Sequence, residues 1–161
     1  MPQVIIDYEE TNYDGLETGQ QELLDQAEAM LVRAYKPYSG FLVATTVRTP
    51  SGEVFSGCNI ENASYGLTVC AERTAIFKGV SEGYRQFSQG AVICKGEDFD
   101  TQEPTGSCGA CAQVMREFSD PEDPMQLIFS TTKKDKIWLV SCTDLLPLGF
   151  GPQDLGIDPT R

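Results

Sequence analysis

The sequence predicts an α/β protein in which helices cover a five-stranded sheet. A length of 161 residues suits one domain with one hydrophobic core. The hydrophobic share of 40% and the charged share of 22% are ordinary for a globular chain. Segments with helical and with strand periodicity alternate along the chain, which is typical of layered α/β architectures. We expect one domain over residues 20–155, between an acidic N-terminal extension at 1–19 and a C-terminal tail at 156–161.

Three helices are predicted. Apolar residues recur at helical spacing from residue 20 to residue 35, and Pro37 ends this first helix. The second helix begins near Cys70 and runs towards residue 83, and the third covers residues 108–118.

Five β-rich runs provide the strands. The runs at residues 41–49 and 53–58 are joined by Pro50-Ser51-Gly52, which is typical of a hairpin turn. The other three runs lie at residues 89–95, 125–130 and 136–141. Within the N-terminal extension, Val4-Ile5-Ile6 could pair with a sheet edge.

The charge balance and the hydropathy pattern limit the partners. Acidic residues outnumber basic residues by 24 to 12, and the formal charge of −12 repels the phosphate backbone of nucleic acids. No apolar window is long enough for a membrane span, and the first residues lack the pattern of a secretory leader. We therefore expect a cytoplasmic protein with no nucleic-acid or membrane partner and with reduced cysteines.

The chain contains no histidine. This excludes Ser-His-Asp and Cys-His catalysis and any zinc site with a histidine ligand. A general acid or base near neutral pH must then be a shifted Asp, Glu, Lys, Tyr or Cys, or a metal-bound water.

Two short cysteine motifs are the strongest chemical signal. Cys70 and the pair Cys108 and Cys111 each fall at a predicted helix start, where the helix dipole favours thiolates. Three thiolates could bind Zn²⁺ and leave the fourth tetrahedral position for water, as in catalytic zinc sites. Glu72 is then placed to accept a proton from that water. Three thiolates leave the centre formally at −1, and Arg73 could offset this charge from the second shell of the metal.

Other interpretations of the cysteines stay open at this point. Cys-x-x-Cys in a reduced protein could be a redox pair, and single cysteines are often small core residues. A closed structural zinc site could also form, with Cys58, Cys94 or Cys142 as the fourth ligand. Spacing alone leaves the structural and the catalytic zinc equally open.

Taken together, the motifs give the chain a resemblance to the small, homo-oligomeric, tetrameric-type zinc cytidine deaminases of pyrimidine salvage. The resemblance covers residues 20–155 and keeps the order of the family's motifs. The matching stretches are Pro37-Tyr38-Ser39-Gly40-Phe41, Gly57-Cys58-Asn59-Ile60-Glu61-Asn62-Ala63, Cys70-Ala71-Glu72-Arg73-Thr74-Ala75-Ile76, Cys108-Gly109-Ala110-Cys111, Gln113-Val114-Met115-Arg116-Glu117-Phe118, Leu145-Leu146-Pro147 and Phe150-Gly151-Pro152.

The resemblance implies a three-layer α/β/α fold with a mixed five-stranded sheet and a catalytic domain at residues 20–155. It implies one Zn²⁺ per subunit, held by Cys70, Cys108 and Cys111. The implied reaction is hydrolytic deamination of cytidine and 2'-deoxycytidine to uridine and 2'-deoxyuridine, in which zinc-bound hydroxide attacks C4 and Glu72 shuttles protons. A homotetramer with active sites shared between subunits is also implied.

The resemblance further implies the substrate contacts. Asn59 and Glu61 would hold the ribose hydroxyls, Phe41 would line the pocket against the base, and the backbone of Ala71 would bond the pyrimidine edge. Phe150 would reach the base from a neighbouring subunit. Read without the resemblance, residues 57–62 are a solvated turn and the aromatic residues belong to the core.

Tyr38 and Tyr65 are assigned, on the same resemblance, to closing the pocket or its subunit boundary. Several positions depart from the family pattern: Ser107 stands where the family usually has proline, Ala112 where it usually has arginine, and Gly40, Leu42 and Thr68 replace more usual residues. These departures leave room for a modified aminopyrimidine nucleoside, such as a blasticidin-type antibiotic, as the substrate. A non-catalytic zinc scaffold and an editing deaminase acting on single-stranded nucleic acid are the remaining alternatives.

Overall fold

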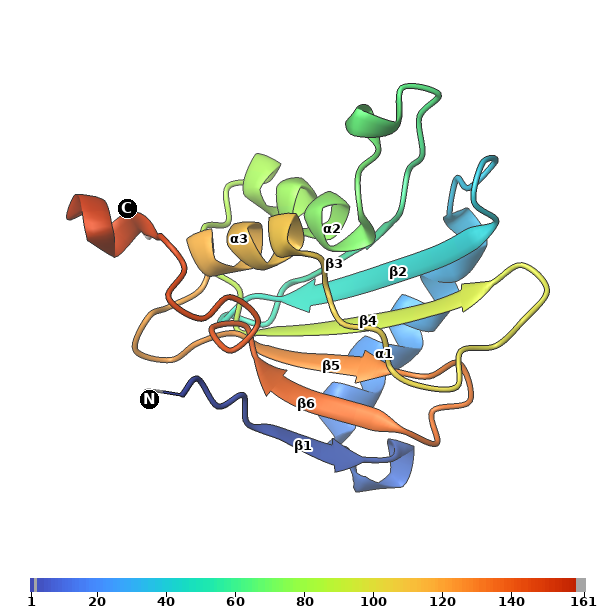
Figure 1. The fold of residues 1–161 in the computed structure, drawn as a ribbon, viewed down its shortest axis with the longest axis horizontal. Helices are drawn as coiled ribbons and strands as arrows, with labels where there is room; N and C mark the ends of the chain where they lie inside the picture. Colours follow the sequence, from blue (N-terminus) through green and yellow to red (C-terminus); the bar gives the residue numbers. More distant parts are fainter. Residues whose placement is uncertain (2, 159–161) are drawn as a thin grey trace.

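Six strands form one mixed sheet with helices on both faces (Figure 1). The computed structural model describes residue 1 and residues 3–158. The strands are β1 (Tyr8–Thr11), β2 (Phe41–Arg48), β3 (Val54–Cys58), β4 (Gln89–Gly96), β5 (Gln126–Ser130) and β6 (Ile137–Ser141). Their order is β1-β6-β5-β4-β2-β3, and all described pairs are antiparallel except β4 with β5. The three-layer α/β/α prediction is confirmed.

The three predicted helices are present with slightly different ends. They are α1 (Thr18–Met30), α2 (Ala71–Ser81) and α3 (Gly109–Glu117). Short 3-10 helices lie at Tyr13–Gly15, Leu31–Arg33, Tyr65–Leu67 and Pro152–Leu155. No helix within the described ranges is long and apolar enough to cross a membrane. The predicted tail at 156–161 is described as far as residue 158, so its last three residues lie outside the described part.

The prediction of five strands was wrong, because part of the N-terminal extension forms a sixth. Tyr8–Thr11 pairs antiparallel with β6 and becomes the sheet edge. The rings of Tyr8 and Trp138 lie 5.4 Å apart, and Trp138 Nε1 donates to Glu10 Oε2 over 3.3 Å. Val4-Ile5-Ile6, the run that could have paired with an edge, lies outside the strand and is exposed.

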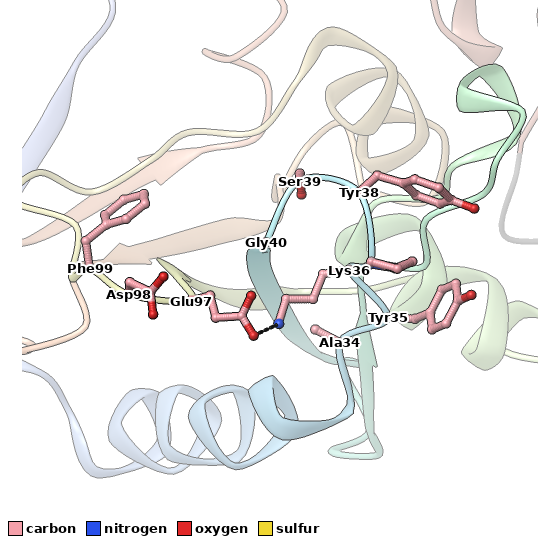
Figure 2. Close-up of a pocket in the computed structure, with 10 residues that line it drawn as sticks. Ala34, Tyr35, Lys36, Tyr38, Ser39, Gly40, Glu97, Asp98 and Phe99 are labelled. Atoms are coloured by element: carbon pink, nitrogen blue, oxygen red, sulfur yellow. Dashed lines mark ion pairs between the residues drawn. The ribbon is translucent and has the colours of Figure 1, made fainter.

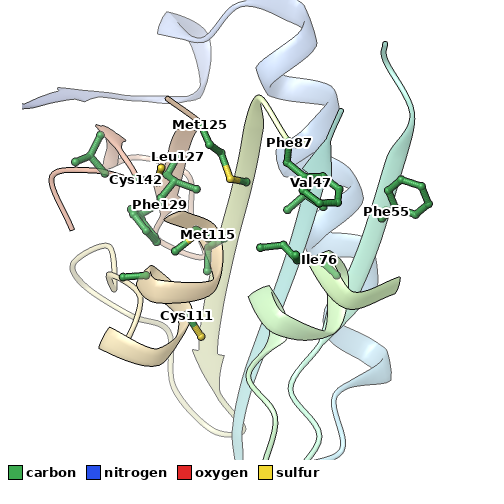
Figure 3. Packing of buried hydrophobic residues seen from close by; sticks show 14 residues of the cluster. Val47, Phe55, Ile76, Phe87, Cys111, Met115, Met125, Leu127, Phe129 and Cys142 are labelled. Carbon is green, nitrogen blue, oxygen red and sulfur yellow. The ribbon is translucent and has the colours of Figure 1, made fainter. Parts of the chain in front are cut away.

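The sheet separates two hydrophobic clusters. On one face α1 covers the cluster that contains Leu24, Ile93 and Ile128. On the other face α2 and α3 cover a larger cluster, in which Phe129 and Met115 pack together with Val92 (Figure 3). Successive strand residues therefore point to opposite faces, as the period of two requires.

A glycine in β3 lets α2 lie close against the sheet. A Cβ atom built on Gly57 would be 2.5 Å from the backbone nitrogen of Ala75 and 2.9 Å from the carbonyl carbon of Thr74. No side chain fits at that distance from a helix backbone. Gly57 therefore sets the distance between α2 and the sheet, and with it the position of the helix start that carries Cys70.

A polar network ties α1 to the loop between β5 and β6. Lys134 Nζ pairs with Asp25 and Glu28 on α1, both at 2.7 Å, and lies 4.9 Å from the centre of the Tyr13 ring. The Tyr13 hydroxyl donates to Asp25 over 2.7 Å. This network holds the start of the domain to the edge of the sheet opposite β3.

Candidate metal and substrate site

The three cysteines of the two motifs come together between the starts of two helices. Cys70 is the N-cap of α2, Cys108 is the N-cap of α3, and Cys111 lies in the first turn of α3. The Sγ atoms are 4.0 Å apart for Cys70 and Cys108 and 3.5 Å apart for Cys108 and Cys111, and all three lie within 4.8 Å of one another. The fold thus brings together two cysteines that are 38 positions apart in the sequence.

The cluster has the dimensions of a tetrahedral zinc site. With Zn–S bonds of about 2.3 Å, thiolates around zinc lie roughly 3.8 Å apart, close to the separations in this chain. Cys58, Cys94 and Cys142 are buried elsewhere in the described fold and do not join the group. The described residues therefore offer three thiol ligands rather than four, and the closed four-cysteine alternative does not form.

The guanidinium of Arg73 contacts the cluster. Its Nη2 lies 3.5 Å from Cys70 Sγ and donates to the carbonyl of Thr68 over 3.3 Å. The hydrogen bond with Cys111, followed by the charge and hydrogen bond of Arg73, lowers the pKa of Cys70 to about 5. Cys70 thus ionises more readily than an ordinary thiol, which suits a metal ligand.

Glu72 lies in the first turn of α2 and is 5% exposed. Burial raises the pKa of this carboxyl, and the nearby Cys70 thiol adds to the increase. Ser107 and the Cys111 thiol act in the opposite direction. A carboxyl whose pKa is raised by burial binds a proton more readily than an exposed carboxyl does, which suits a group that accepts and returns protons.

Asn59 is held by the first residues of β2, and Glu61 by the segment that leads into this strand. The Asn59 amide accepts from Val43 N and donates to Phe41 O, both over 2.9 Å, and the residue is 8% exposed. Glu61 accepts from Tyr38 N over 2.8 Å, from Ser39 N over 3.3 Å and from the Ser39 hydroxyl. The interpretation of residues 57–62 as a merely solvated turn does not fit these contacts.

The Glu61 carboxylate is ionised in this setting. Hydrogen bonds from the Ser39 hydroxyl and then from Tyr38 N hold its pKa below the usual range. Tyr38 and Tyr65 meet in a T-shaped pair with ring centres 5.7 Å apart. Together with Ser39, Glu61 and Thr68 they line a cavity of 310 Å³.

The three residues predicted to contact the base, Ala71, Phe41 and Phe150, differ in how deeply they are buried. Ala71 is fully buried at the first position of α2, and Phe41 is half-buried at the start of β2. Phe150 is 59% exposed in the segment after β6, where its carbonyl accepts from Gln113 over 3.0 Å. Cys70, Ala71 and Glu72 are thus brought to the cluster, whereas the described contacts of Phe150 are confined to its own segment and α3.

Two neighbours of Phe41 and Glu61 are additional to the predicted residues. Phe99, on the loop after β4, places its ring 6.4 Å from that of Phe41. Ser39 lies in the matched stretch 37–41, but its hydrogen bond to Glu61 joins residues 22 positions apart and is invisible in the sequence.

A second cavity lies beside the same segment. Figure 2 shows this cavity of 620 Å³, with Tyr38 and Ser39 at one end and Phe99 at the other. The ion pair between Lys36 and Glu97, at 2.7 Å, crosses it. The segment 35–40 therefore has a hollow on each side of it, and hydrogen bonds to Glu61 hold its position.

Comparisons with known proteins agree with this geometry. Residues 17–125 match the family model described as the cytidine and deoxycytidylate deaminase zinc-binding region. The chain is 40% identical to a cytidine deaminase of Sporosarcina psychrophila over 135 residues, which is 84% of this chain and 93% of that protein. It is 42% identical to a cytidine deaminase of Halalkalibacterium halodurans over 135 residues, 84% of this chain and 96% of the relative.

Solved structures give the same result. A crystal structure of cytidine deaminase from Burkholderia pseudomallei has a TM-score of 0.72 at 42% identity and covers 80% of this chain and 97% of that one. Cytidine deaminase from Mycobacterium tuberculosis has a TM-score of 0.67 at 30% identity, with coverage of 84% and 99%. The chain is thus similar to these cytidine deaminases in both sequence and fold.

Proposed function

Because the chain belongs to the cytidine and deoxycytidylate deaminase family, we propose that it is an enzyme that deaminates cytidine hydrolytically. The observation that carries this proposal is the buried carboxyl of Glu72 beside three converging thiols. The named relatives act as cytidine deaminases, which does not favour a blasticidin-type substrate. We extend the proposal to 2'-deoxycytidine and to a role in pyrimidine salvage.

Cys70, Cys108 and Cys111 would hold one zinc ion in each subunit. When bound, the ion would activate a water molecule for attack on C4 of the pyrimidine. Glu72 would carry one proton from that water to N3 of the ring and a second proton, from the hydroxyl newly bonded to C4, to the departing amino group, so that ammonia leaves and uridine remains. Its burial supports this role, because burial raises the pKa of the carboxyl towards the range in which a group serves as acid and base in turn.

Asn59 and Glu61 would hold the ribose while shaping the pocket wall. The Asn59 amide keeps one N–H and one lone pair beyond its bonds to Phe41 and Val43. The Glu61 carboxylate also has acceptor capacity beyond its bonds to Tyr38 and Ser39. These groups can therefore bind sugar hydroxyls without releasing the segment that carries Phe41.

The proposal includes a homotetramer in which Phe150 of one subunit covers the base in another. The exposure of Phe150 supports this arrangement, as does the exposure of Tyr65 at 73% and Leu67 at 67%. Apolar side chains this exposed on a chain of this charge are typical of subunit contacts. Light scattering measures the assembly directly, and a monomer would contradict Phe150 acting between subunits.

Zinc quantification combined with a cytidine assay tests the function. We expect the zinc-loaded protein to convert cytidine and 2'-deoxycytidine, followed by the loss of cytosine absorbance. Glu72→Gln should reduce kcat by at least about 100-fold while zinc content and melting temperature are kept. A zinc-loaded wild-type protein without turnover, or an active Glu72→Gln variant, would refute the enzyme in favour of a zinc scaffold.

A further inference from the structure

The Phe41 ring is packed against an aromatic side chain from a turn at residues 96–99. Gly96 is the partner of Phe41 at the end of the β2–β4 ladder, and it offers no side chain to pack there. The chain then folds back, and Gly96 N donates to Phe99 O over 2.9 Å. A Cβ atom built on Gly96 would be 2.0 Å from a carbon of the Phe99 ring. The Phe99 ring therefore takes the place of the missing cross-strand side chain, with its centre 6.4 Å from that of Phe41.

The same turn is bonded to the segment that leads into Phe41. The backbone N–H of Glu97 donates to the carbonyl of Gly40 over 2.8 Å. The Glu97 carboxylate pairs with Lys36 Nζ at 2.7 Å, as Figure 2 shows, and the Lys36 side chain is only 21% exposed. Backbone, ionic and aromatic contacts therefore join the turn to residues 36–41.

The segment 36–41 is bonded on another side to the proposed sugar contacts. Each backbone N–H from residue 38 to residue 41 donates a hydrogen bond. Two of these bonds go to the Glu61 carboxylate, and the carbonyl of Phe41 accepts from the Asn59 amide over 2.9 Å. A shift of the segment would therefore move the Phe41 ring and the sugar contacts together.

We propose that Phe99 is a positioning residue for nucleoside binding that acts through the Phe41 ring, and that Glu97 supports it by anchoring the segment 36–41. This inference rests on the proposed deaminase function. Phe99 is assigned no contact with substrate. Because this role concerns the pocket and not the thiol cluster or Glu72, its loss should weaken cytidine binding and leave the chemical step in place.

Steady-state kinetics on zinc-loaded variants separate binding from chemistry. Phe99→Ala should raise KM for cytidine about 5-fold, with kcat within about 2-fold and with full zinc content. Phe99→Tyr, which keeps the ring, should return KM to within about 2-fold of wild type. Asp98→Ala is the matched control and should match wild type, because Asp98 is exposed on the same turn and has no hydrogen bond or ion pair in the described structure.

The Phe41→Ala background tests whether Phe99 acts through the Phe41 ring. There, adding Phe99→Ala should raise KM by less than about 2-fold, because the ring that Phe99 positions is already gone. Increases in KM that multiply in the double variant would overturn the proposal. So would an unchanged KM in Phe99→Ala, a loss of kcat in its place, or a Phe99→Tyr variant as impaired as Phe99→Ala.

Amide hydrogen exchange tests the contact without turnover. The amide hydrogens of residues 38–41 are all bonded, so their exchange rate reports the opening of this segment. Phe99→Ala should speed their exchange about 5-fold and leave α1 at wild-type rates. Unchanged exchange at residues 38–41 would overturn the proposal. If the wild type lacks turnover, the proposed function fails, while exchange still decides whether Phe99 holds the segment.

Discussion

At the scale of single residues, the charge of the thiol cluster depends on Arg73. Three thiolates around a divalent ion leave a net negative charge, and the Arg73 guanidinium lies 3.5 Å from Cys70 Sγ. Ala112, where the family usually has arginine, is fully buried in the cluster of core residues under α3. No second guanidinium can therefore come from that position, and in the proposed zinc site the neutralising role would fall to Arg73 and the two helix starts.

Arg73→Gln should weaken zinc binding or turnover about 10- to 100-fold, because it removes the cation and the donor to Cys70. Chelator competition gives the zinc affinity, and the cytidine assay gives kcat. Arg85→Gln is the matched control, since Arg85 follows the other end of α2 and bonds only backbone carbonyls. A neutral Arg73→Gln variant would show that the helix starts alone balance the charge.

The sequence was sufficient to predict that the cysteines and Glu72 lie at helix starts. It was not sufficient to predict the hydrogen bonds of the proposed sugar contacts. Cys70, Glu72, Cys108 and Cys111 lie in two short motifs whose spacing alone puts them at helix starts. The bonds of Asn59 and Glu61 to residues 38–43 depend on the pairing of β2 with β3. Such contacts follow from tertiary structure, and no local pattern contains them.

At the scale of elements, two segments differ from the sequence prediction, and in each the tertiary partner explains the difference. The segment Tyr8–Thr11 contains two glutamates and lacks a strand pattern, yet β6 offers it an open edge and Trp138 a ring to pack on. The first helix was expected to reach Tyr35 but ends earlier. Tyr35 instead exchanges backbone hydrogen bonds with residues 59 and 61, at 3.0 and 2.9 Å. In both cases a distant strand or loop outweighs local propensity.

Gly57→Ala should destabilise the fold by about 1–3 kcal/mol and reduce zinc affinity, because the new methyl group meets the backbone of α2 rather than a flexible side chain. Urea unfolding and zinc titration measure the two effects. Gly66→Ala serves as the control, since nothing lies within 4 Å of a Cβ there. Equal stability of the two variants would show that α2 can shift without disturbing the site.

The polar network that ties α1 to the β5–β6 loop should make a pH-dependent contribution to the free energy of unfolding. Burial alone would raise the pKa of Asp25, but hydrogen bonds from Lys134 and Tyr13 outweigh it and lower the pKa. A lowered carboxyl pKa stabilises the fold above the unfolded-state value and loses this effect as the pH falls through the folded-state value.

Asp25→Asn should therefore cost about 0.5–1 kcal/mol of unfolding free energy near pH 6, and the difference from wild type should narrow below about pH 4. Urea unfolding between pH 6 and pH 3 tests this prediction. Asp123→Asn, which removes an exposed carboxyl with no hydrogen bond or ion pair in the described structure, should match wild type throughout. A difference for Asp25→Asn that widens in acid would contradict the assigned sign.

At the scale of the whole molecule, the proposed homotetramer would distribute the active site over more than one chain. The thiols, Glu72 and the proposed sugar contacts would belong to one subunit, whereas Phe150 projects from the segment after β6 with more than half of its surface exposed. In a symmetric oligomer, one subunit can contribute a residue to the active site of its neighbour. Such a site is shared between subunits, whereas a self-contained site is built from one chain.

Mixed assemblies of two inactive variants should recover activity. Glu72→Gln keeps Phe150, and Phe150→Ala keeps Glu72, so random mixing should create intact sites at about one quarter of positions. The measurement is cytidine turnover after the two variants are unfolded, mixed and refolded. Each variant refolded alone is the control. Absence of recovery, with tetramers present by light scattering, would place Phe150 outside the neighbour's site.

The unequal surroundings of the six cysteines also determine how oxidants and alkylating reagents would attack the protein. Cys58, Cys94 and Cys142 are buried, and desolvation raises the pKa of each thiol, so they react slowly. Cys108 is exposed and Cys70 ionises readily. The described surface exposes no other cysteine, so we expect oxidation to begin at the thiol cluster, and on the proposed function activity would be lost while the fold is still intact.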